Sequence, residues 1–252
     1  MATERELLKA VLAKPDDDKP RLAYADWCDA RKDPRGEFIR LQLKAAKLGR
    51  RNGAPYRVEA TALASKNRTR WARGVIMYVD ELEFHRGFVE HVETSAERFL
   101  DSAERLFQSA PIRHLKLSGS STTLQQLFHS PHLASIRSLA LPYCKLEDRD
   151  LEVLSSSPSL AQLRWLSLYQ NNIDQSGVEA LATSKNLPNL RYVDLDDNPF
   201  NPCEQFSHDM GYIADSWLPP EGEELEKRHG RIEWLHRQAS TTDDLPPDRF
   251  TM

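Results

Sequence analysis

The segment 15–42 concentrates side chains that an active site would use. Three consecutive aspartates, Asp16 to Asp18, precede a Tyr-Ala-Asp-Trp run and an Arg-Gly-Glu-Phe-Ile-Arg run. Acids beside arginines and aromatic rings are the residue types that acid–base chemistry needs. Aspartates just before a helix also have a structural role, because they cap its free amide groups and favour its dipole. We therefore expect capping here rather than catalysis or metal binding.

Other patterns with known chemistry are incomplete or missing in the sequence. Residues 194–198, Asp-Leu-Asp-Asp-Asn, look like part of a calcium loop, but the glycine and the bidentate acid that an EF-hand needs do not follow. The sequence has no nucleophile elbow, no P-loop, no dinucleotide-binding glycine pattern and no His-Glu-x-x-His motif. We expect a protein that is not an enzyme, with no catalytic residues, no metal site and no cofactor.

The composition is that of a globular protein. The chain has 252 residues, of which 40% are hydrophobic and 29% charged, and its net charge is −4. No apolar run is long enough to span a membrane, and the first residues lack the pattern of a secretory signal. Cys28, Cys144 and Cys203 lie far apart, which favours a reduced compartment over a disulfide framework. We expect a cytoplasmic protein that does not contact a membrane.

Positive charge is concentrated in one stretch. Residues 31–73 contain thirteen Lys and Arg residues against three acidic ones. The simpler interpretation is a solvated helix face, and the alternative is a surface that binds anions or nucleic acid. The residues of that alternative basic patch are Arg50, Arg51, Arg57, Lys66, Arg68, Arg70 and Arg73.

A repeated pattern determines the expected fold. Four segments begin with the order Leu/Ile-Arg-x-Leu/Val-x-Leu, and they start at the nearly evenly spaced positions Ile112, Ile136, Leu163 and Leu190. Each predicts a short strand whose leucines point inward, followed by a helix. Asn171 and Asn198 follow two of these strands and are expected to bond backbone groups at the turn. Gly177 is expected to allow a close approach of the following helix.

This pattern resembles leucine-rich repeats of the ribonuclease-inhibitor type. The resemblance implies an α/β fold, a short right-handed solenoid with parallel strands on its concave side and helices on its convex side. Cys144 and Ser120 replace the asparagine in two repeats, and "SGSSTT" (118–123) is expected to form a loop. Residues 87–111 are interpreted as a degenerate first repeat, a strand followed by a helix that Ser95 caps.

Residues 1–49 predict three short helices. Thr3 and Glu6 form a capping-box pattern, Asp18 is expected to cap a second helix over 19–31, and Asp33 with Pro34 begins a third that ends at Gly49. Helix periodicity places Tyr24 and Trp27 on an inner face and allows two ion pairs between helices, Asp26 with Arg40 and Arg21 with Glu37. We assign structural roles to Arg21, Tyr24, Asp26, Trp27, Glu37, Arg40, Asn171 and Asn198.

The stretch "LLKAVLAKPDDDKPRLAYADWCDARKDPRGEFIRLQ" closely resembles the repeat-companion domain of bacteria such as planctomycetes and myxobacteria. The resemblance covers about residues 5–45. It departs at Cys28, where the family usually has an aliphatic residue. In that family the module stands ahead of leucine-rich or other repeats, and the resemblance implies no catalytic activity.

Together these patterns predict five parts. They are a helical repeat-companion domain at 1–50, a helical connector at 51–86, the leucine-rich repeats at 87–203, a C-terminal cap at 204–238 and a mobile tail at 239–252. Trp217, Leu225, Trp234 and Leu235 are expected to make the cap cover the open end of the core.

The concave face is the expected binding site. Strand alternation would expose an aromatic and charged set there, consisting of His114, Lys116, Trp165, Tyr169, Tyr192, Asp194 and Asp196. Because Trp and Tyr often carry interface energy, we expect an adaptor that binds a protein partner, with Trp165 and Tyr192 as anchors. Alternatively, these side chains tile the surface or lie under the C-terminal segment.

Two further functions stay open. The chain could be a regulated substrate or subunit of a partner enzyme such as a protease, cut in "SGSSTT" or after Trp217. It could also bind anions or nucleic acid through residues 31–73, although nucleic acid is the less expected partner.

Overall fold

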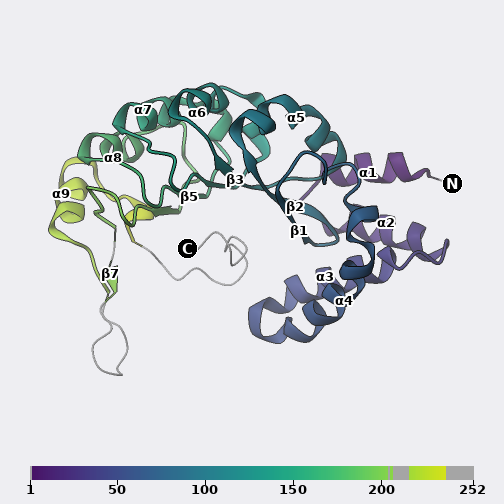
Figure 1. Ribbon diagram of the computed structural model, residues 1–252. Coiled ribbons are helices and arrows are strands. Elements are labelled where there is room, and N and C mark those ends of the chain that lie inside the picture. Colours follow the sequence, from purple (N-terminus) through teal and green to yellow (C-terminus); the bar gives the residue numbers. More distant parts are fainter. Residues whose placement is uncertain (1, 204, 207–215, 237–252) are drawn as a thin grey trace. The chain divides into compact units, whose positions relative to one another are not determined.

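The computed structural model describes residues 2–203, 205–206 and 216–236 (Figure 1). Within them the chain is a mixed α/β protein with nine α-helices and one open six-stranded sheet of order β1-β2-β3-β4-β5-β6. The described residues divide into two compact units, the first within 2–94 and 101–113 and the second within 95–100 and 114–236. None of the helices in these ranges has the length and apolar character needed to cross a membrane.

The first unit begins with helices whose starts follow local signals. Its elements are α1 (Glu4–Ala13), α2 (Asp18–Asp29), α3 (Arg35–Asn52), α4 (Ala54–Trp71), β1 (Glu81–His85) and β2 (Phe88–Ser95). The predicted capping box is confirmed, since Glu6 N donates to Thr3 Oγ1 and Thr3 N donates to the Glu6 carboxylate. The prediction that Asp18 caps the second helix is wrong by one residue, because Asp17 accepts from Lys19 N at 2.9 Å.

Helix α3 differs from the prediction at both ends. It begins at Arg35, one residue later than expected, although Asp33 still caps it by accepting from Arg35 N at 2.9 Å. Gly49 has φ 72°, so the regular helix is interrupted there as predicted, but helical bonding resumes as far as Asn52. Helix α4 packs against α3 around a small aromatic core in which the rings of Phe38 and Trp71 stack at 4.7 Å.

A β-hairpin completes the first unit. The expected helical connector over 51–86 is helical only in part, because β1 occupies its end and pairs antiparallel with β2. Gly87 closes the hairpin with φ 88°, and a Cβ there would lie 2.4 Å from the side chain of Ile39 on α3. The strand and helix predicted within 87–111 are confirmed as β2 and α5 (Ala96–Ser109), and Ser95 Oγ accepts from Arg98 N.

The second unit alternates parallel strands with helices. Its elements are β3 (His114–Ser118), α6 (Ser121–Phe128), η1 (Pro131–Ser135), β4 (Ser138–Ala140), α7 (Asp148–Ser156), η2 (Pro158–Leu160), β5 (Trp165–Ser167), α8 (Gln175–Ala182), β6 (Tyr192–Asp194), β7 (Gln205–Phe206), β8 (Ser216–Trp217), α9 (Pro220–His229) and η3 (Glu233–Leu235). Strands β3 to β6 pair in parallel, while β7 and β8 form a separate antiparallel pair. Helices α6, α7 and α8 follow one another along one side of β3–β6 (Figure 1).

The core of this unit lies between the strands and those helices. The predicted inward leucines are all buried: Leu115, Leu117, Leu139, Leu141, Leu166 and Leu168, with Val193 and Leu195 in the last repeat. Each contributes about 1.5–3 kcal/mol by leaving water. Gly177 on α8 is needed for close packing, because a Cβ there would lie 2.6 Å from Asp148 Oδ1.

The turns after the strands are closed by asparagine side chains. Asn171 Oδ1 accepts from the backbone N of Cys144 and Leu146, and its Nδ2 donates to the carbonyls of Leu141 and Leu168. It therefore joins its own turn to the preceding one. Asn198 acts in the same way one repeat later, so the structural roles predicted for both asparagines are confirmed.

The turns that lack this asparagine are closed differently, as expected. Cys144 Sγ lies 3.6 Å from Leu117 O and 3.4 Å from Pro142 O. The loop predicted at 118–123 is wrong, because Ser120 caps a helix that begins at Ser121, its Oγ accepting from Thr123 N.

The C-terminal cap is partly within the described residues. Leu225, Trp234 and Leu235 are buried as expected, and η3 lies against β6, whereas Trp217 is 45% exposed. Residues 204, 207–215 and 237–238 of the expected cap and the whole expected tail at 239–252 lie outside the described residues.

Candidate functional site

Three residues stand at the same place just beyond strands β4, β5 and β6. Tyr143, Gln170 and Asp197 occupy equivalent positions of successive sequence repeats and have φ of 59°, 51° and 58°. Non-glycine residues seldom adopt this left-handed region. The turns hold them there because the backbone ladder continues past the strands: Tyr143 N donates to Tyr169 O at 3.2 Å, and Gln170 N donates to Asp196 O at 2.9 Å.

An aromatic pair lies on this edge. The rings of Tyr143 and Tyr169 meet edge to face, with centroids 5.5 Å apart, and Tyr143 is 63% exposed. A hydrogen bond with the Asp197 carboxylate, helped by its negative charge, raises the pKa of Tyr169 to about 12. Asp196 is exposed next to it and accepts from Asn201 Nδ2. We call Tyr143, Tyr169, Asp196 and Asp197 the tyrosine–aspartate edge.

The strand residues expected to be exposed anchors are placed differently. Trp165 is only 6% exposed, and Tyr192 is half-buried. The in-register pairing of β5 with β6 sets the two residues side by side, and their rings pack together at 4.8 Å. The expectation of Trp165 as an exposed anchor is therefore wrong, because this ring is part of the packing.

The polar residues of the same strands bond to their neighbours along the sheet. Ser167 Oγ donates to Asp194 Oδ2 at 2.8 Å, and the His114 ring lies 2.9 Å from Ser138 Oγ. Asp194 is buried as a result, whereas His114 and Lys116 are half-buried. Of the seven predicted partner-binding residues, Tyr169 and Asp196 lie together on the tyrosine–aspartate edge.

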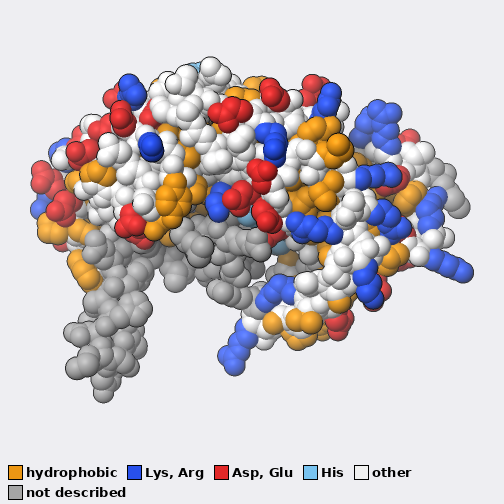
Figure 2. Space-filling model, in the orientation of Figure 1, with side chains coloured by type: hydrophobic (Ala, Val, Ile, Leu, Met, Phe, Trp, Pro, Cys, Tyr) orange, Lys and Arg blue, Asp and Glu red, His pale blue; other side chains and the backbone are white. Residues whose placement is uncertain are grey.

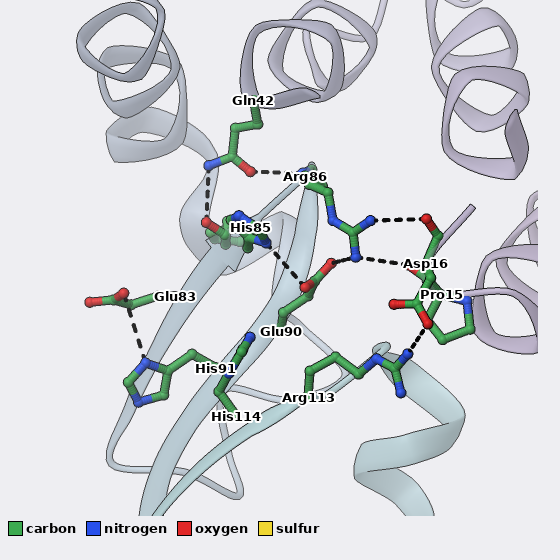
Figure 3. A network of polar contacts seen from close by, with 12 residues as sticks. Pro15, Asp16, Gln42, Glu83, His85, Arg86, Glu90, His91, Arg113 and His114 are labelled. Atoms are coloured by element: carbon green, nitrogen blue, oxygen red, sulfur yellow. Dashed lines mark hydrogen bonds and ion pairs between the residues drawn. The ribbon is translucent and has the colours of Figure 1, made fainter. Parts of the chain in front are cut away.

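The first unit contains a buried polar network around Glu90 on β2 (Figure 3). The Glu90 carboxylate accepts from Arg21 at 2.5 Å and from Arg86 at 3.2 Å, and it lies 3.1 Å from His85 Nδ1. Arg21 also donates to the carbonyls of Pro15 and Arg86. The network thus ties the α1–α2 turn to the β1–β2 hairpin.

Three further contacts lie around this network. Gln42 on α3 donates to Phe84 O and accepts from Gly87 N, and Asp16 pairs with Arg113 at 2.6 Å (Figure 3). Burial alone would raise the pKa of Glu90, but the hydrogen bond and charge of His85, with Arg21 and Arg86, hold it at about 2. A carboxylate that stays ionised and is enclosed by cations is suited to structure rather than to proton transfer.

The structural residues predicted in the N-terminal segment are mostly confirmed. Arg40 pairs with Asp26 as predicted, and also with Asp29 at 2.9 Å. Tyr24 is buried and donates to Glu4 at 2.8 Å. Trp27 is half-buried under Arg31, whose guanidinium lies 3.9 Å from its ring.

One predicted pair is wrong. Arg21 does not pair with Glu37, which is exposed, because its guanidinium points to Glu90 on β2. Helix periodicity could compare only neighbouring helices, whereas the true partner lies 69 residues away.

The predicted basic residues do not all belong to one surface. Arg70 pairs with Asp33 at 2.7 Å, Arg68 donates to Leu82 O, and Arg73 lies 4.0 Å from Glu4. Lys66, Arg51 and Arg57 are exposed, while the side chain of Arg50 lies outside the described residues. The positive charge near the end of α3 and the start of α4 is thus separate from the arginines that follow.

The remaining candidate sites are a metal site and two segments for cleavage by a protease. In the parts of the chain that the structure places, no three His, Cys, Asp or Glu side chains come together as a metal site. The first expected protease site lies at the capped start of α6, and the residues after Trp217 lead directly into α9. Neither offers the extended, exposed segment that proteases prefer to cut.

Comparison with known proteins adds no family: no family model and no curated protein matches this chain.

The sequence interpretation missed Tyr143 and Glu90, whereas Asp197 was expected among the acids beside the aromatic residues. A signal existed for Tyr143, because it stands one repeat before Gln170, directly ahead of the asparagine position. Helix and strand periodicity gave no signal for Glu90, because its partner Arg21 lies 69 residues away in the sequence.

Proposed function

We propose that this chain is a non-enzymatic interaction module that binds a protein partner at the tyrosine–aspartate edge. In this proposal the second unit is a short leucine-rich-repeat solenoid, and the first contains a repeat-companion domain. The nearly equal strand–helix steps and the asparagine-closed turns support the solenoid.

The observation that carries the binding proposal is the exposed aromatic pair. Tyr143 exposes 63% of its surface. Its backbone has a left-handed conformation, φ 59°, which is unfavourable for a bulky residue. Its ring rests against Tyr169, so little side-chain entropy is lost when a partner covers it. Tyrosines held in this way are typical of interface hot spots.

The neighbouring charges define the chemistry of the partner. Asp196 and Asp197 are exposed beside the rings. A lysine or arginine of the partner would contact a carboxylate and the face of a tyrosine at the same time. We therefore propose a partner that presents a basic side chain next to an apolar one.

Site-specific photo-crosslinking in the native host tests this proposal. Tyr143→p-benzoylphenylalanine should give one discrete crosslinked protein, which mass spectrometry identifies. The same photo-reactive residue at Val58, which is 70% exposed on α4, is the matched control and should not give that product.

The affinity of the chain for the purified partner then tests whether the tyrosine–aspartate edge is the binding site. Tyr143→Ala should weaken binding roughly 30-fold, as expected for a hot spot of about 2 kcal/mol. Asp197→Asn should slow association and reduce its salt dependence, whereas Val58→Ala should leave both unchanged. Unchanged affinity in both edge variants would rule the edge out as the binding site.

A further inference from the structure

The end of the α3–α4 hairpin exposes apolar side chains that the core of the first unit does not use. Val58 on α4 is 70% exposed, Leu48 on α3 is 40% exposed, and Ala54 and Pro55 at the start of α4 are also exposed. The core between the two helices is built by other residues: Phe38, Ala60 and Trp71 with Leu41, Leu63 and Ala64. The exposed apolar residues therefore contribute little to folding, because they have not left water.

Basic side chains accompany these apolar residues. Lys44 and Lys47 share the exposed face of α3 with Leu48, at helical spacings of three and four residues, and Arg51 is exposed next to the turn. Residues 44–58 contain no acidic residue, although the whole chain has a net charge of −4. The hairpin end thus combines apolar side chains with positive charge.

The turn holds the two kinds of side chain close together. A Cβ at Gly53 would lie 2.3 Å from Ala45 O, so the start of α4 approaches α3 closely. The Lys44 ammonium lies 4.2 Å from the centre of the Tyr56 ring, which places a cation of α3 beside the first turn of α4. Figure 2 shows hydrophobic and basic side chains next to each other over the region that Figure 1 draws as α3 and α4.

The types of these side chains favour a lipid surface over a protein as the partner. Protein interfaces are enriched in Trp, Tyr and Arg and depleted in Lys. Here the exposed apolar residues are small or aliphatic, and Tyr56, the one aromatic residue within 44–58, is half-buried under Lys44. The interface of a bilayer accepts aliphatic side chains, while lysine stems extend along it and place their charge among the headgroups.

We propose that the hairpin end formed by Lys44, Lys47, Leu48, Arg51 and Val58 binds the surface of a membrane that contains anionic lipids. The two apolar side chains enter the interface, and the three cations contact the headgroups. Three cations and a small apolar area give weak and reversible binding.

The expectation that the chain does not contact a membrane rests on its lack of a spanning segment. Binding to the surface of a bilayer does not need such a segment. The proposal concerns the first unit and does not depend on the tyrosine–aspartate edge.

Co-sedimentation of the full chain with sucrose-loaded vesicles tests this proposal. Vesicles made of equal parts phosphatidylcholine and phosphatidylserine should bind the chain. Vesicles of phosphatidylcholine alone should bind it roughly 100-fold more weakly, because each of the three cations contributes about 5-fold near an anionic surface. Raising the NaCl concentration from 50 to 500 mM should weaken binding to the anionic vesicles, because salt screens the charge of the headgroups.

Paired neutral substitutions locate the binding surface. Lys47→Gln with Arg51→Gln should weaken binding to the anionic vesicles roughly 25-fold. Lys145→Gln with Lys185→Gln makes the same change of net charge at exposed positions of the second unit and should weaken binding less than about 3-fold. Circular dichroism melting checks that each variant remains folded.

Single substitutions next to the cations test the apolar contact and the sign of the charge. Val58→Gln should weaken binding roughly 5-fold and leave its salt dependence unchanged. Met77→Gln is the matched control and should not weaken binding, because Met77 is 81% exposed beyond the opposite end of α4. Glu59→Gln removes the exposed acid that follows Val58 and should strengthen binding roughly 5-fold.

Three results would overturn the proposal. The first is a wild-type protein that does not sediment with the anionic vesicles at 50 mM NaCl. The second is an equal loss of affinity in both double variants. The third is binding to a fluorescein-labelled 20-base-pair DNA duplex that is as strong as binding to the anionic vesicles, because charge alone would then explain the attraction.

Discussion

Replacing Glu90 by glutamine separates the charge of the buried network from its shape. Glutamine has the same size but cannot balance the guanidinium of Arg21, which is fully buried. Removing one partner of a buried ion pair costs about 3–5 kcal/mol. Arg21 keeps its bonds to the carbonyls of Pro15 and Arg86, so we expect a loss of about 3 kcal/mol in the free energy of unfolding at pH 7.

The pH dependence reports on the same carboxylate through its contacts with His85, Arg21 and Arg86 together. The pKa of Glu90 is about 2 in the folded protein against an ordinary value of 4.5. Because the folded pKa is depressed, the stabilisation of the folded protein by ionised Glu90 is complete above the unfolded pKa. This stabilisation is lost as the pH falls from about 5 to 2. The difference between the two pKa values corresponds to about 3 kcal/mol of stabilisation from all three partners.

Urea unfolding of wild type and Glu90→Gln, followed by far-ultraviolet circular dichroism at pH 7, 5 and 3, measures both effects. The gap between the two proteins should shrink as the pH falls, because wild-type Glu90 gains a proton on unfolding. Glu37→Gln, at an exposed position of α3, is the control and should change stability by less than about 0.5 kcal/mol. A gap of the same size at pH 3 and pH 7 would refute the ion-pair explanation.

The second unit supports three further predictions. Asn171→Ala should lower the free energy of unfolding by about 3 kcal/mol in urea titration, since the backbone N–H groups of Cys144 and Leu146 lose their acceptor; a loss below about 1 kcal/mol would contradict this. Leu166→Ala should cost about 2–5 kcal/mol by leaving a cavity, and an unchanged melting temperature would count against the assigned core. Ultraviolet titration at high pH should show Asp197→Asn lowering the pKa of Tyr169 from about 12, and the effect should vanish in a Tyr169→Phe background; an unshifted titration would show that the carboxylate is not its partner.

The sequence predicted those features that depend on residues close along the chain or on equivalent residues of successive repeats. The capping box at Thr3, the strand leucines and the two turn asparagines belong to this group. Their signals are local because a cap or a strand face is made by residues a few positions apart. The partner of Arg21 could not be found in this way, because Glu90 is brought near only by the tertiary fold.

The exposure of individual residues was the least predictable property. Alternation correctly separates the two faces of a strand, but it does not say how much of the second face reaches solvent. Parallel in-register pairing sets Trp165 beside Tyr192 and Ser167 beside Asp194, so these side chains contact each other. The turn residue Tyr143 lies beyond the end of β4, and its side chain remains exposed.

The asparagine network links the stability of the second unit to the geometry of the tyrosine–aspartate edge. Asn171 holds Leu141 O and Cys144 N, which flank Tyr143 in the sequence, and through Leu168 O it also fixes the chain that leads to Tyr169. One side chain therefore sets the relative position of the two rings before any partner arrives. A surface fixed in advance loses less entropy on binding than a mobile one. The residues that close the turns thus serve the proposed binding site although they would not touch the partner.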